Sequence, residues 1–401
     1  MSDITIWNAR PWGGAARDIS VRDGRVVEIK PHDVSAARSD VDVDGAGRII
    51  VPSFTDAHVH LDSTRIGLPF RPHSAEPGPI WNQIMNDRAN WRSAEASVAD
   101  RATETLGRAI ANGMTRARSY AQVDADCRLE RLEGVLAARD EHALRSRVEI
   151  VAFPQAGLLL EPGVPALMEA GLRSGADIVG GIDPCALDGD PRQHLDIVFE
   201  LAERHHARVD IHLHEPGELG LFTARKIIER VRALDYRSRV TIAHAFFLAD
   251  LPNVARQQVL EDLAELDIAL TTVAPAGRSP LPFLEIAEYG IRFGLGQDGQ
   301  RDYWSPYGNT DMLERTWMLA YTNGMRRDEH IEGALLSATL GGAAVIDSDT
   351  PTGPERGFGV GDAADFVLLD AETATSAVMD RPTDRTVIHE GRVVADKGSL
   401  R

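Results

Sequence analysis

The sequence has little of three features that would each indicate a class of protein. Its 401 residues include only two cysteines, Cys127 and Cys185, and no CxxC pair, which excludes a disulfide framework and a cysteine-based zinc site. No run of 18 apolar residues occurs, so no segment predicts a transmembrane helix. The net charge of −18 leaves no basic excess for a polyanion, which argues against a nucleic-acid partner.

The composition is that of an acidic globular protein. Apolar residues make up 43% of the chain and charged residues 26%, which allows a large buried core. No apolar run follows the first ten residues, MSDITIWNAR. We therefore expect a cytoplasmic protein that has no membrane partner, and we expect it to form a homo-oligomer.

Both ends of the chain show short strands separated by Gly and Asp, the pattern of β-hairpins. The segments are ITIWNAR, ARDISVRDGRVVEIK and DVDGAGRII at one end, and ADFVLLD and RTVIHEGRVVADKG at the other. RDGRVVEI and HEGRVVAD are similar turn-plus-strand units. The sequence predicts a small β-sandwich domain built from residues 1–50 and 355–401, with residues 51–354 inserted between its halves.

The middle of the chain alternates between β-rich runs and helical patterns. The expected strands are 51–60, 115–120, 148–154, 177–183, 208–214, 239–245, 267–273 and 292–298, and helical patterns such as 94–111 and 254–266 lie between them. Eight strands that alternate with helices predict an α/β fold of the (β/α)8 TIM barrel type, whose reactive residues lie at the carboxyl ends of the strands. The polar residues at those ends are His60, Gln155, His212, His214, His244 and Asp298.

Segment 51–62, VPSFTDAHVHLD, ends an apolar run with two histidines. Residues two apart in a strand point to the same side, so His58 and His60 present both imidazoles at the carboxyl end of the first strand. Two nitrogens placed in this way can bind one cation. A pair of hydrogen-bonded polar residues at a strand tip is the alternative, and the later motifs favour the metal.

The fifth strand carries a second histidine pair in IHLHE. His212 and His214 lie on the same inward face, and Glu215 follows at the mouth of the barrel. His212 is the best third ligand, and Glu215 can reach a metal-bound water and carry its proton. For His214 we favour a role in the substrate pocket, and a role as an alternate metal ligand is the second interpretation.

The last two motifs end the sixth and eighth strands. His244, in TIAHAF, can orient or polarise the group that is attacked, and Asp298, in GLGQDG, can bind the metal and take a proton from its water. A divalent ion at such a site lowers the pKa of bound water toward neutrality. The predicted ligands, three nitrogens and one oxygen, are His58, His60, His212 and Asp298.

Together these motifs resemble the amidohydrolase superfamily, and most closely its cytosine deaminase-like branch. The resemblance covers nearly the whole chain; HxH, HxxE and the terminal Asp are typical of the superfamily, and VAFPQ at 151–155 and WSPYGN at 304–309 of the branch. It implies that the predicted ligands hold zinc or iron, that Gln155 hydrogen-bonds a ring amide and that Trp304 forms a wall of the pocket. It also implies hydrolytic deamination of an amino-substituted N-heterocycle, such as an aminopyrimidine, with release of ammonia.

Lysine is scarce, and this bears on the number of metals. Binuclear members of the superfamily commonly bridge two ions with a carboxylated lysine on the fourth strand. The only lysines of the chain are Lys30, Lys226 and Lys397, so none lies on that strand. The resemblance therefore implies one divalent metal per chain.

The chain departs from cytosine deaminases around the pocket. Those enzymes resemble HCDE where this chain has HLHE, carry a second aspartate where Gly299 follows Asp298, and have an RTHVD-like run where this chain has RSYAQVD. These changes leave the hydrolytic residues in place. They predict a small heterocyclic substrate other than cytosine.

There are three alternatives to a deaminase of this superfamily. The closest alternative is a hydrolase of the same fold that opens a cyclic amide or removes an alkylamine from a triazine-like ring. HxxE favours deamination, because expelling an amine from a ring carbon requires a nearby acid. A zinc deaminase of the tRNA type would show HxE and PCxxC, which are absent. A non-enzymatic barrel scaffold would lack some of the ligands, and none is missing.

Overall fold

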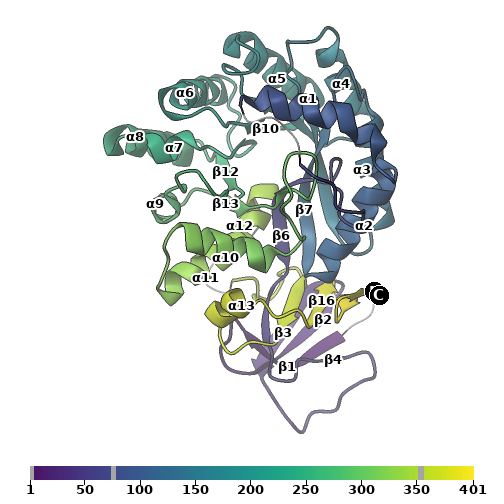
Figure 1. Cartoon of the computed structure of the whole chain (residues 1–401). Coiled ribbons are helices and arrows are strands. Elements are labelled where there is room, and N and C mark those ends of the chain that lie inside the picture. Colours follow the sequence, from purple (N-terminus) through teal and green to yellow (C-terminus); the bar gives the residue numbers. More distant parts are fainter. Residues whose placement is uncertain (1–3, 74–77, 351–355) are drawn as a thin grey trace.

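The computed structural model describes residues 4–73, 78–350 and 356–401 and shows two sheets, one for each predicted part of the fold (Figure 1). The parallel sheet has the strand order β13-β12-β11-β10-β9-β8-β7-β6-β14. β14 follows β13 closely along the chain and pairs with β6, so the sheet curls until its first and last strands meet. This confirms the predicted α/β fold of the TIM-barrel type. Its strands are β6 (Phe54–His60), β7 (Met114–Gln122), β8 (Arg147–Phe153), β9 (Ile178–Ile182), β10 (Arg208–His212), β11 (Val240–Ala243), β12 (Ala269–Thr272), β13 (Phe293–Leu295) and β14 (Asp298–Gly299).

Helices surround this sheet, and their sequences show why they form. In α2 (Val98–Ala111), the Ser97 side chain accepts a hydrogen bond from the backbone N–H of Asp100, and Leu106, Ala109 and Ile110 are buried along one face. None of the described helices is long and apolar enough to cross a membrane. The others are α1 (Ile80–Asn90), α3 (Glu130–Glu141), α4 (Val164–Arg173), α5 (Pro191–His205), α6 (Gly217–Ala233), α7 (Phe247–Asp250), α8 (Asn253–Glu265), α9 (Phe283–Glu288), α10 (Met312–Thr322), α11 (Asp328–Ser337), α12 (Leu340–Ile346) and α13 (Ala374–Asp380), with the short 3-10 helix Trp91–Ser93 after α1.

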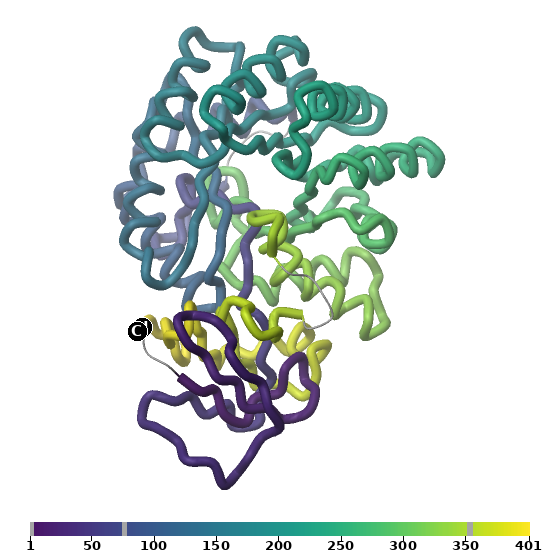
Figure 2. Tube along the Cα trace, turned by 180° about the vertical axis from the view of Figure 1, so that it is seen from behind, coloured from purple at the N-terminus to yellow at the C-terminus, as the bar shows by residue number. Residues whose placement is uncertain are grey.

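The two ends of the chain form the second, mixed sheet, which lies below the barrel in Figure 1 and brings purple and yellow segments together in Figure 2. The turns of the two similar hairpins meet, because Ala364 donates a hydrogen bond to Gly24 and accepts one from Gly391. This second sheet, built from both termini, fits the expected extra domain. Its strands are β1 (Ile4–Pro11), β2 (Arg17–Arg22), β3 (Arg25–Pro31), β4 (Val43–Asp44), β5 (Ile49–Pro52), β15 (Phe366–Leu369), β16 (Arg385–His389), β17 (Arg392–Asp396) and β18 (Ser399–Leu400).

The expected strand 51–60 is divided between the two sheets. Val51 and Pro52 complete β5, which pairs with β15, and β6 begins at Phe54. Both strands are fully buried, so the apolar run shows no change of pattern at the break. The other predicted domain boundary, between residues 354 and 355, lies outside the described residues.

A buried ion pair links the terminal sheet to the barrel. Arg385, at the start of β16, is 1% exposed and donates to both carboxylate oxygens of Asp311 at 2.8 Å and to the backbone oxygen of Asn112 at 2.6 Å. Removing one partner of a buried pair leaves the other charge without compensation. The pair therefore contributes to the stability of this interface.

We expect Arg385→Met to lower the free energy of unfolding by about 3 kcal/mol, because Asp311 loses its bidentate partner. Urea unfolding of the full chain measures the change. The control is Arg108→Met, which breaks an exposed ion pair with Glu104 and should change stability by less than about 1 kcal/mol. Equal effects of the two substitutions would contradict the assignment.

Candidate active site

The strand register brings the predicted ligands to one level at the carboxyl ends of the barrel strands. His60 of β6 lies opposite Gly299 of β14, so the adjacent Asp298 faces the histidine pair. The Asp298 Oδ1 atom is 3.6 Å from His58 Nε2 and 3.4 Å from His60 Nε2. His212, the last residue of β10, places its Nε2 atom 3.4 Å from His60 Nε2. The four residues therefore converge on one point.

His244 lies in the same cluster. Two groups of three residues, His58–His212–His244 and His58–His60–Asp298, have ligand atoms within 4.8 Å of one another, and they share His58. The ring centroids of His58 and His244 are 4.7 Å apart. His244 could therefore also offer a ligand atom to an ion bound by His58 and His212.

Several ring nitrogens of this cluster have no hydrogen-bond partner within the part of the chain that the structure describes. Among the described residues, both ring nitrogens of His58 and of His244, and Nδ1 of His212, are buried without a hydrogen-bond partner. Buried polar atoms are nearly always hydrogen-bonded, so a group of unpartnered nitrogens whose residues bring ligand atoms within 4.8 Å of one another indicates a binding site for a ligand. A divalent metal ion fits this arrangement, because imidazole nitrogen and carboxylate oxygen are ligands of zinc and iron.

The pKa values of the cluster suit a cation. Burial lowers the pKa of His58 to about 4 and holds the pKa values of His212 and His244 well below the ordinary range, so these rings are neutral at neutral pH. Burial alone would raise the pKa of Asp298, but its contact with His58 holds that pKa well below its usual value. Neutral nitrogens and an ionised carboxylate are the forms that bind metal.

Backbone and aromatic contacts hold the cluster in place. His244, directly after β11, and Asp298, the first residue of β14, have φ values of 67° and 65°, a left-handed conformation that non-glycine residues adopt mainly where the surroundings enforce it. Tyr120, fully buried on β7, forms the floor. Its ring centroid lies 4.3 Å from that of His58, 5.0 Å from that of His60 and 4.4 Å from that of His212.

A cavity of about 460 Å³ opens beside this cluster. Polar residues such as Gln155 and Asp302 line part of it, which we call the polar side. The segment after β12, including Val273, and Met318 of α10 form the part that we call the apolar side. The lining residues are His60, Asp62, Ser63, Gln122, Arg131, Gln155, His212, His214, His244, Val273, Pro275, Ala276, Gln297, Asp298, Gly299, Asp302, Trp304, Ser305, Tyr307, Arg315 and Met318. The predicted substrate-binding residues Gln155, His214 and Trp304 therefore all line one cavity with the cluster.

His214 is held by an aspartate that follows β9. Its Nδ1 atom lies 2.8 Å from Asp183 Oδ2, and its backbone N–H donates to Asp183 Oδ1 at 2.7 Å. Because a carboxylate accepts, the proton lies on Nδ1, and Nε2 is left as an acceptor. The rings of His214 and His244 have centroids 4.2 Å apart, so this histidine stands beside the cluster.

Glu215 is placed differently from the sequence-based expectation of a residue at the barrel mouth. Its Oε1 atom accepts hydrogen bonds from the backbone N–H groups of Cys185 and Ala186 at 2.7 and 2.8 Å, and its Oε2 atom accepts one from the Thr223 hydroxyl. Among the described residues, Glu215 does not belong to the cavity lining. Its carboxylate braces the loop that begins at Asp183.

Sequence reasoning missed three residues of the site. Tyr120 forms the floor, Asp183 holds His214, and Asp302 presents a carboxyl to the cavity. For Asp183 a signal existed, because it ends the expected strand 177–183 and is therefore at the reactive end of the barrel. Tyr120 carries the same positional signal, because it ends the expected strand 115–120, whereas Asp302 lies beyond the expected strands and carries none.

The chain is similar to several known proteins over nearly its whole length. The crystal structure of N-isopropylammelide isopropylaminohydrolase from Burkholderia multivorans has a TM-score of 0.93 and 37% identity, with 100% of both chains covered. N-isopropylammelide isopropyl amidohydrolase from Pseudomonas sp. strain ADP is 25% identical over 94% of this chain and 93% of its own length. 5-Methylcytosine deaminase from Klebsiella pneumoniae, at 24% identity, a TM-score of 0.79 and coverage of 98% and 97%, shares the fold.

The amidohydrolase family matches residues 70–395, which is most of the chain. This match and the 37% identical neighbour confirm the resemblance to the amidohydrolase superfamily. Members of this family typically bind a divalent metal, in agreement with the histidine and aspartate cluster. The chain therefore belongs to the amidohydrolase family and is a hydrolase acting on carbon–nitrogen bonds.

Proposed function

We propose that this hydrolase uses one divalent metal, zinc or iron, to displace an amine substituent from a ring carbon of a small N-heterocycle. One observation carries the proposal. The histidine and aspartate cluster and His214, whose Nδ1 is held by Asp183, line the same cavity of about 460 Å³. A metal-binding cluster and a proton carrier beside a small cavity are what hydrolysis of a ring carbon–nitrogen bond requires.

We propose further that the leaving group is an alkylamine. The apolar side of the cavity supports an alkylamine leaving group. An alkyl chain can be surrounded there by Val273, Pro275, Ala276 and Met318, while Gln155 would contact the polar ring. The Burkholderia neighbour, 37% identical over the whole chain, is named for removing isopropylamine from N-isopropylammelide. The argument from HxxE for ammonia release depended on a Glu215 that faces the ring, and its carboxylate instead contacts the loop after β9.

The metal would be held by His58, His60, His212 and Asp298, with His244 close to the same point. When bound, it lowers the pKa of a water molecule and so supplies a nucleophile near neutral pH. Gln155 would hydrogen-bond the ring through its amide, Trp304 would cover one face of the ring, and His244 would orient the ring carbon that is attacked. These contacts hold the substrate in position for attack.

His214 would carry the proton. Its Nε2 atom accepts a proton as the carbon–oxygen bond forms and returns it to the amine nitrogen as the carbon–nitrogen bond breaks. Asp183 stabilises the imidazolium that exists between these two steps, because its carboxylate accepts from Nδ1–H. The overall reaction consumes one water and yields a hydroxylated ring and a free amine, so atoms and charge balance.

A substrate screen tests this proposal. The panel contains aminopyrimidines including cytosine, amino- and alkylamino-dihydroxytriazines, pterins and a cyclic amide, and each product is identified by mass spectrometry. We expect the highest kcat/KM for an alkylamino ring, with release of the alkylamine. If the fastest reaction is release of ammonia from an amino ring, the leaving group is ammonia and not an alkylamine. If the main product is a ring-opened carboxylate, the proposal of amine displacement is wrong.

Narrowing the apolar side of the cavity should separate the two kinds of substrate. Ala276→Leu adds bulk to the cavity wall. A misfit of this size in an apolar pocket changes kcat/KM by about 10- to 100-fold. We expect that loss for an isopropylamino ring and a loss of less than about threefold for the corresponding amino ring, which serves as the internal control. Equal losses for both rings would show that the alkyl group does not contact this side.

A further inference from the structure

The polar side of the cavity contains a carboxyl group from outside the metal cluster. Asp302 is 3% exposed, lines the cavity and lies against the backbone of Gly299. A Cβ atom added to Gly299 would lie 2.9 Å from Cγ of Asp302, which is closer than real Cβ atoms approach their neighbours. The absence of a side chain at Gly299 is therefore what allows Asp302 to occupy this place beside Asp298.

The Asp302 carboxylate is fixed by its own hydrogen bonds. Oδ1 accepts from the backbone N–H groups of Trp304 and Ser305 at 2.8 and 2.9 Å, and Oδ2 accepts from the Ser63 hydroxyl at 3.0 Å. A carboxylate offers about four acceptor positions, so capacity for a further donor remains. The group is ready to bind a donor without moving.

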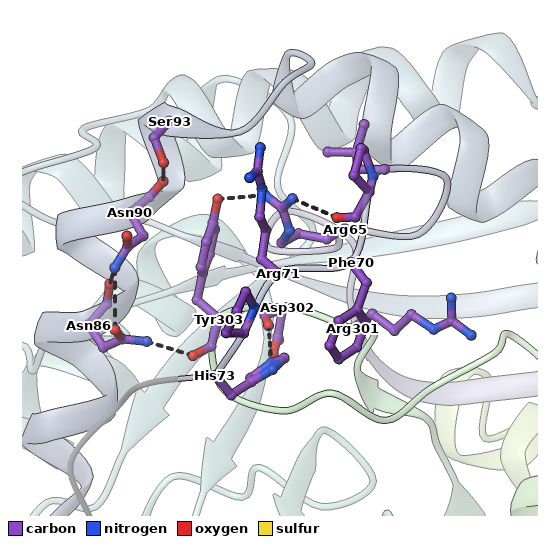
Figure 3. A pocket seen from close by; sticks show the side chains of 13 residues that line it. Arg65, Phe70, Arg71, His73, Asn86, Asn90, Ser93, Arg301, Asp302 and Tyr303 are labelled. Atoms are coloured by element: carbon purple, nitrogen blue, oxygen red, sulfur yellow. Dashed lines mark hydrogen bonds between the residues drawn. The ribbon is translucent and has the colours of Figure 1, made fainter.

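The loop that carries Asp302 is also held from its other side. In a second pocket, shown in Figure 3, His73 Nε2 lies 2.8 Å from the backbone oxygen of Asp302, and Asn86 donates to the backbone oxygen of Tyr303 at 2.8 Å. Arg65 donates to the Tyr303 hydroxyl at 2.8 Å. These contacts fix the position of Asp302 independently of any substrate.

The charges around Asp302 favour a hydrogen-bond donor over an anion. Two arginines line the cavity, and both are engaged within the protein. Arg131 is shared by Asp62 and Asp87, and Arg315 donates to the backbone oxygens of Val273 and Gln297. Burial raises the pKa of Asp302 to about 6, and the charge of Asp87 adds to the shift, so the carboxyl is ionised at neutral pH. The ionised carboxylate of Asp302 repels an anionic group placed next to it and can accept a hydrogen bond from an N–H group.

We propose that Asp302 is a specificity-determining residue that accepts a hydrogen bond from an N–H group of the substrate ring. The substrate is then a heterocycle in its oxo form, with a ring N–H beside the carbon that carries the amine. This inference rests on the proposed function for the identity of the ring, but its test uses binding as well as turnover. A site built around such a hydrogen bond rejects a ring that lacks the donor.

The test compares 1,3,5-triazine-2,4,6-trione, which presents N–H groups, with its N-trimethyl derivative, by calorimetry on the metal-loaded protein. We expect the wild-type protein to bind the N–H ring at least about 100-fold more tightly. Asp302→Asn keeps an oxygen for Trp304 and Ser305 but replaces Oδ2, an acceptor, with an NH2 donor, so it should reduce this preference to less than tenfold. Gly299→Ala, which displaces Asp302, should do the same.

Two controls separate recognition from a loosened loop. Tyr303→Phe removes the contact with Arg65 but leaves the carboxylate, and Gly333→Ala adds a methyl group in α11, where its nearest neighbour is 3.6 Å away. Both should keep the preference for the N–H ring. Metal content, measured for every variant, should stay unchanged.

Failure of this inference can be told apart from failure of the proposed function. If wild-type protein binds both rings equally or binds neither, or if Asp302→Asn weakens both by the same factor, Asp302 does not recognise the N–H group. If the binding preference is as expected but no ring of the panel loses its amine, Asp302 keeps its role and amine displacement is wrong. Turnover of an alkylamino-dioxo-triazine should follow the binding result, with KM raised more than kcat is lowered in Asp302→Asn.

Discussion

Replacing His212 by alanine is expected to remove both the bound metal and nearly all turnover. The His212 Nε2 atom lies 3.4 Å from that of His60, and the buried Nδ1 atom of His212 has no hydrogen-bond partner among the described residues. In the proposed metal site, the substitution removes one of the four ligands. A divalent ion contributes several kcal/mol to transition-state stabilisation, so kcat/KM should fall by about 10³- to 10⁴-fold.

Metal analysis and kinetics on the same preparations measure both effects. The wild-type protein should hold about one zinc or iron ion per chain, and the His212→Ala protein should hold much less than one. His194→Ala is the matched control, because His194 is equally buried but bonds to Asp188 on the outer side of the barrel wall. It should lose stability and keep its metal. Two firmly bound ions per wild-type chain, or full activity after chelation, would contradict the single-metal site.

The fold could be predicted because strand and helix alternate along the chain with clear periodicity. All eight predicted barrel strands overlap strands of the structure, from β6 to the β13–β14 pair. The prediction was wrong in detail where one apolar run encodes two strands, at Pro52 and Phe54. Both strands are buried on both faces, so hydrophobicity does not change at the point where the chain passes from one sheet to the other.

The site could be predicted only as far as the strands extend. The rule that reactive residues follow barrel strands places His60, His212 and Asp298 together, and the structure agrees. β10 ends at His212, so the alternation of faces no longer fixes where Glu215 points. Its direction is decided by the backbone N–H groups of Cys185 and Ala186, which come from another loop. Contacts between loops of this kind leave no periodic trace in a sequence.

His214 is expected to carry the proton, so replacing it by asparagine should lower kcat by about 10²- to 10⁴-fold while the metal is retained. Asparagine keeps a polar side chain near Asp183 but cannot accept and return a proton. Because His214 lies beside the cluster and not between its ligands, metal content should stay at the wild-type value. Loss of metal from this variant would instead identify His214 as a ligand.

Asp183→Asn tests whether the aspartate acts through His214. The amide can donate to Nδ1, which favours the tautomer with its proton on Nε2 and so removes the acceptor from the cavity. We expect a loss similar to that of His214→Asn. The double variant should lose little more than either single variant, because residues that act as one unit are not additive. Additive losses would show that Asp183 and His214 act separately.

Glu215→Gln decides between the two possible proton carriers. The carboxylate braces Cys185 and Ala186, two and three residues after Asp183, and glutamine keeps an oxygen that can accept from those N–H groups. If Glu215 positions Asp183, kcat should fall by only about tenfold, and the effect should disappear when His214 is already asparagine. A loss of about 10³-fold or more that persists in the His214→Asn background would assign the proton to Glu215. It would also require the carboxylate to leave its bonds to the loop during turnover, which hydrogen exchange at the Cys185 and Ala186 amides would detect.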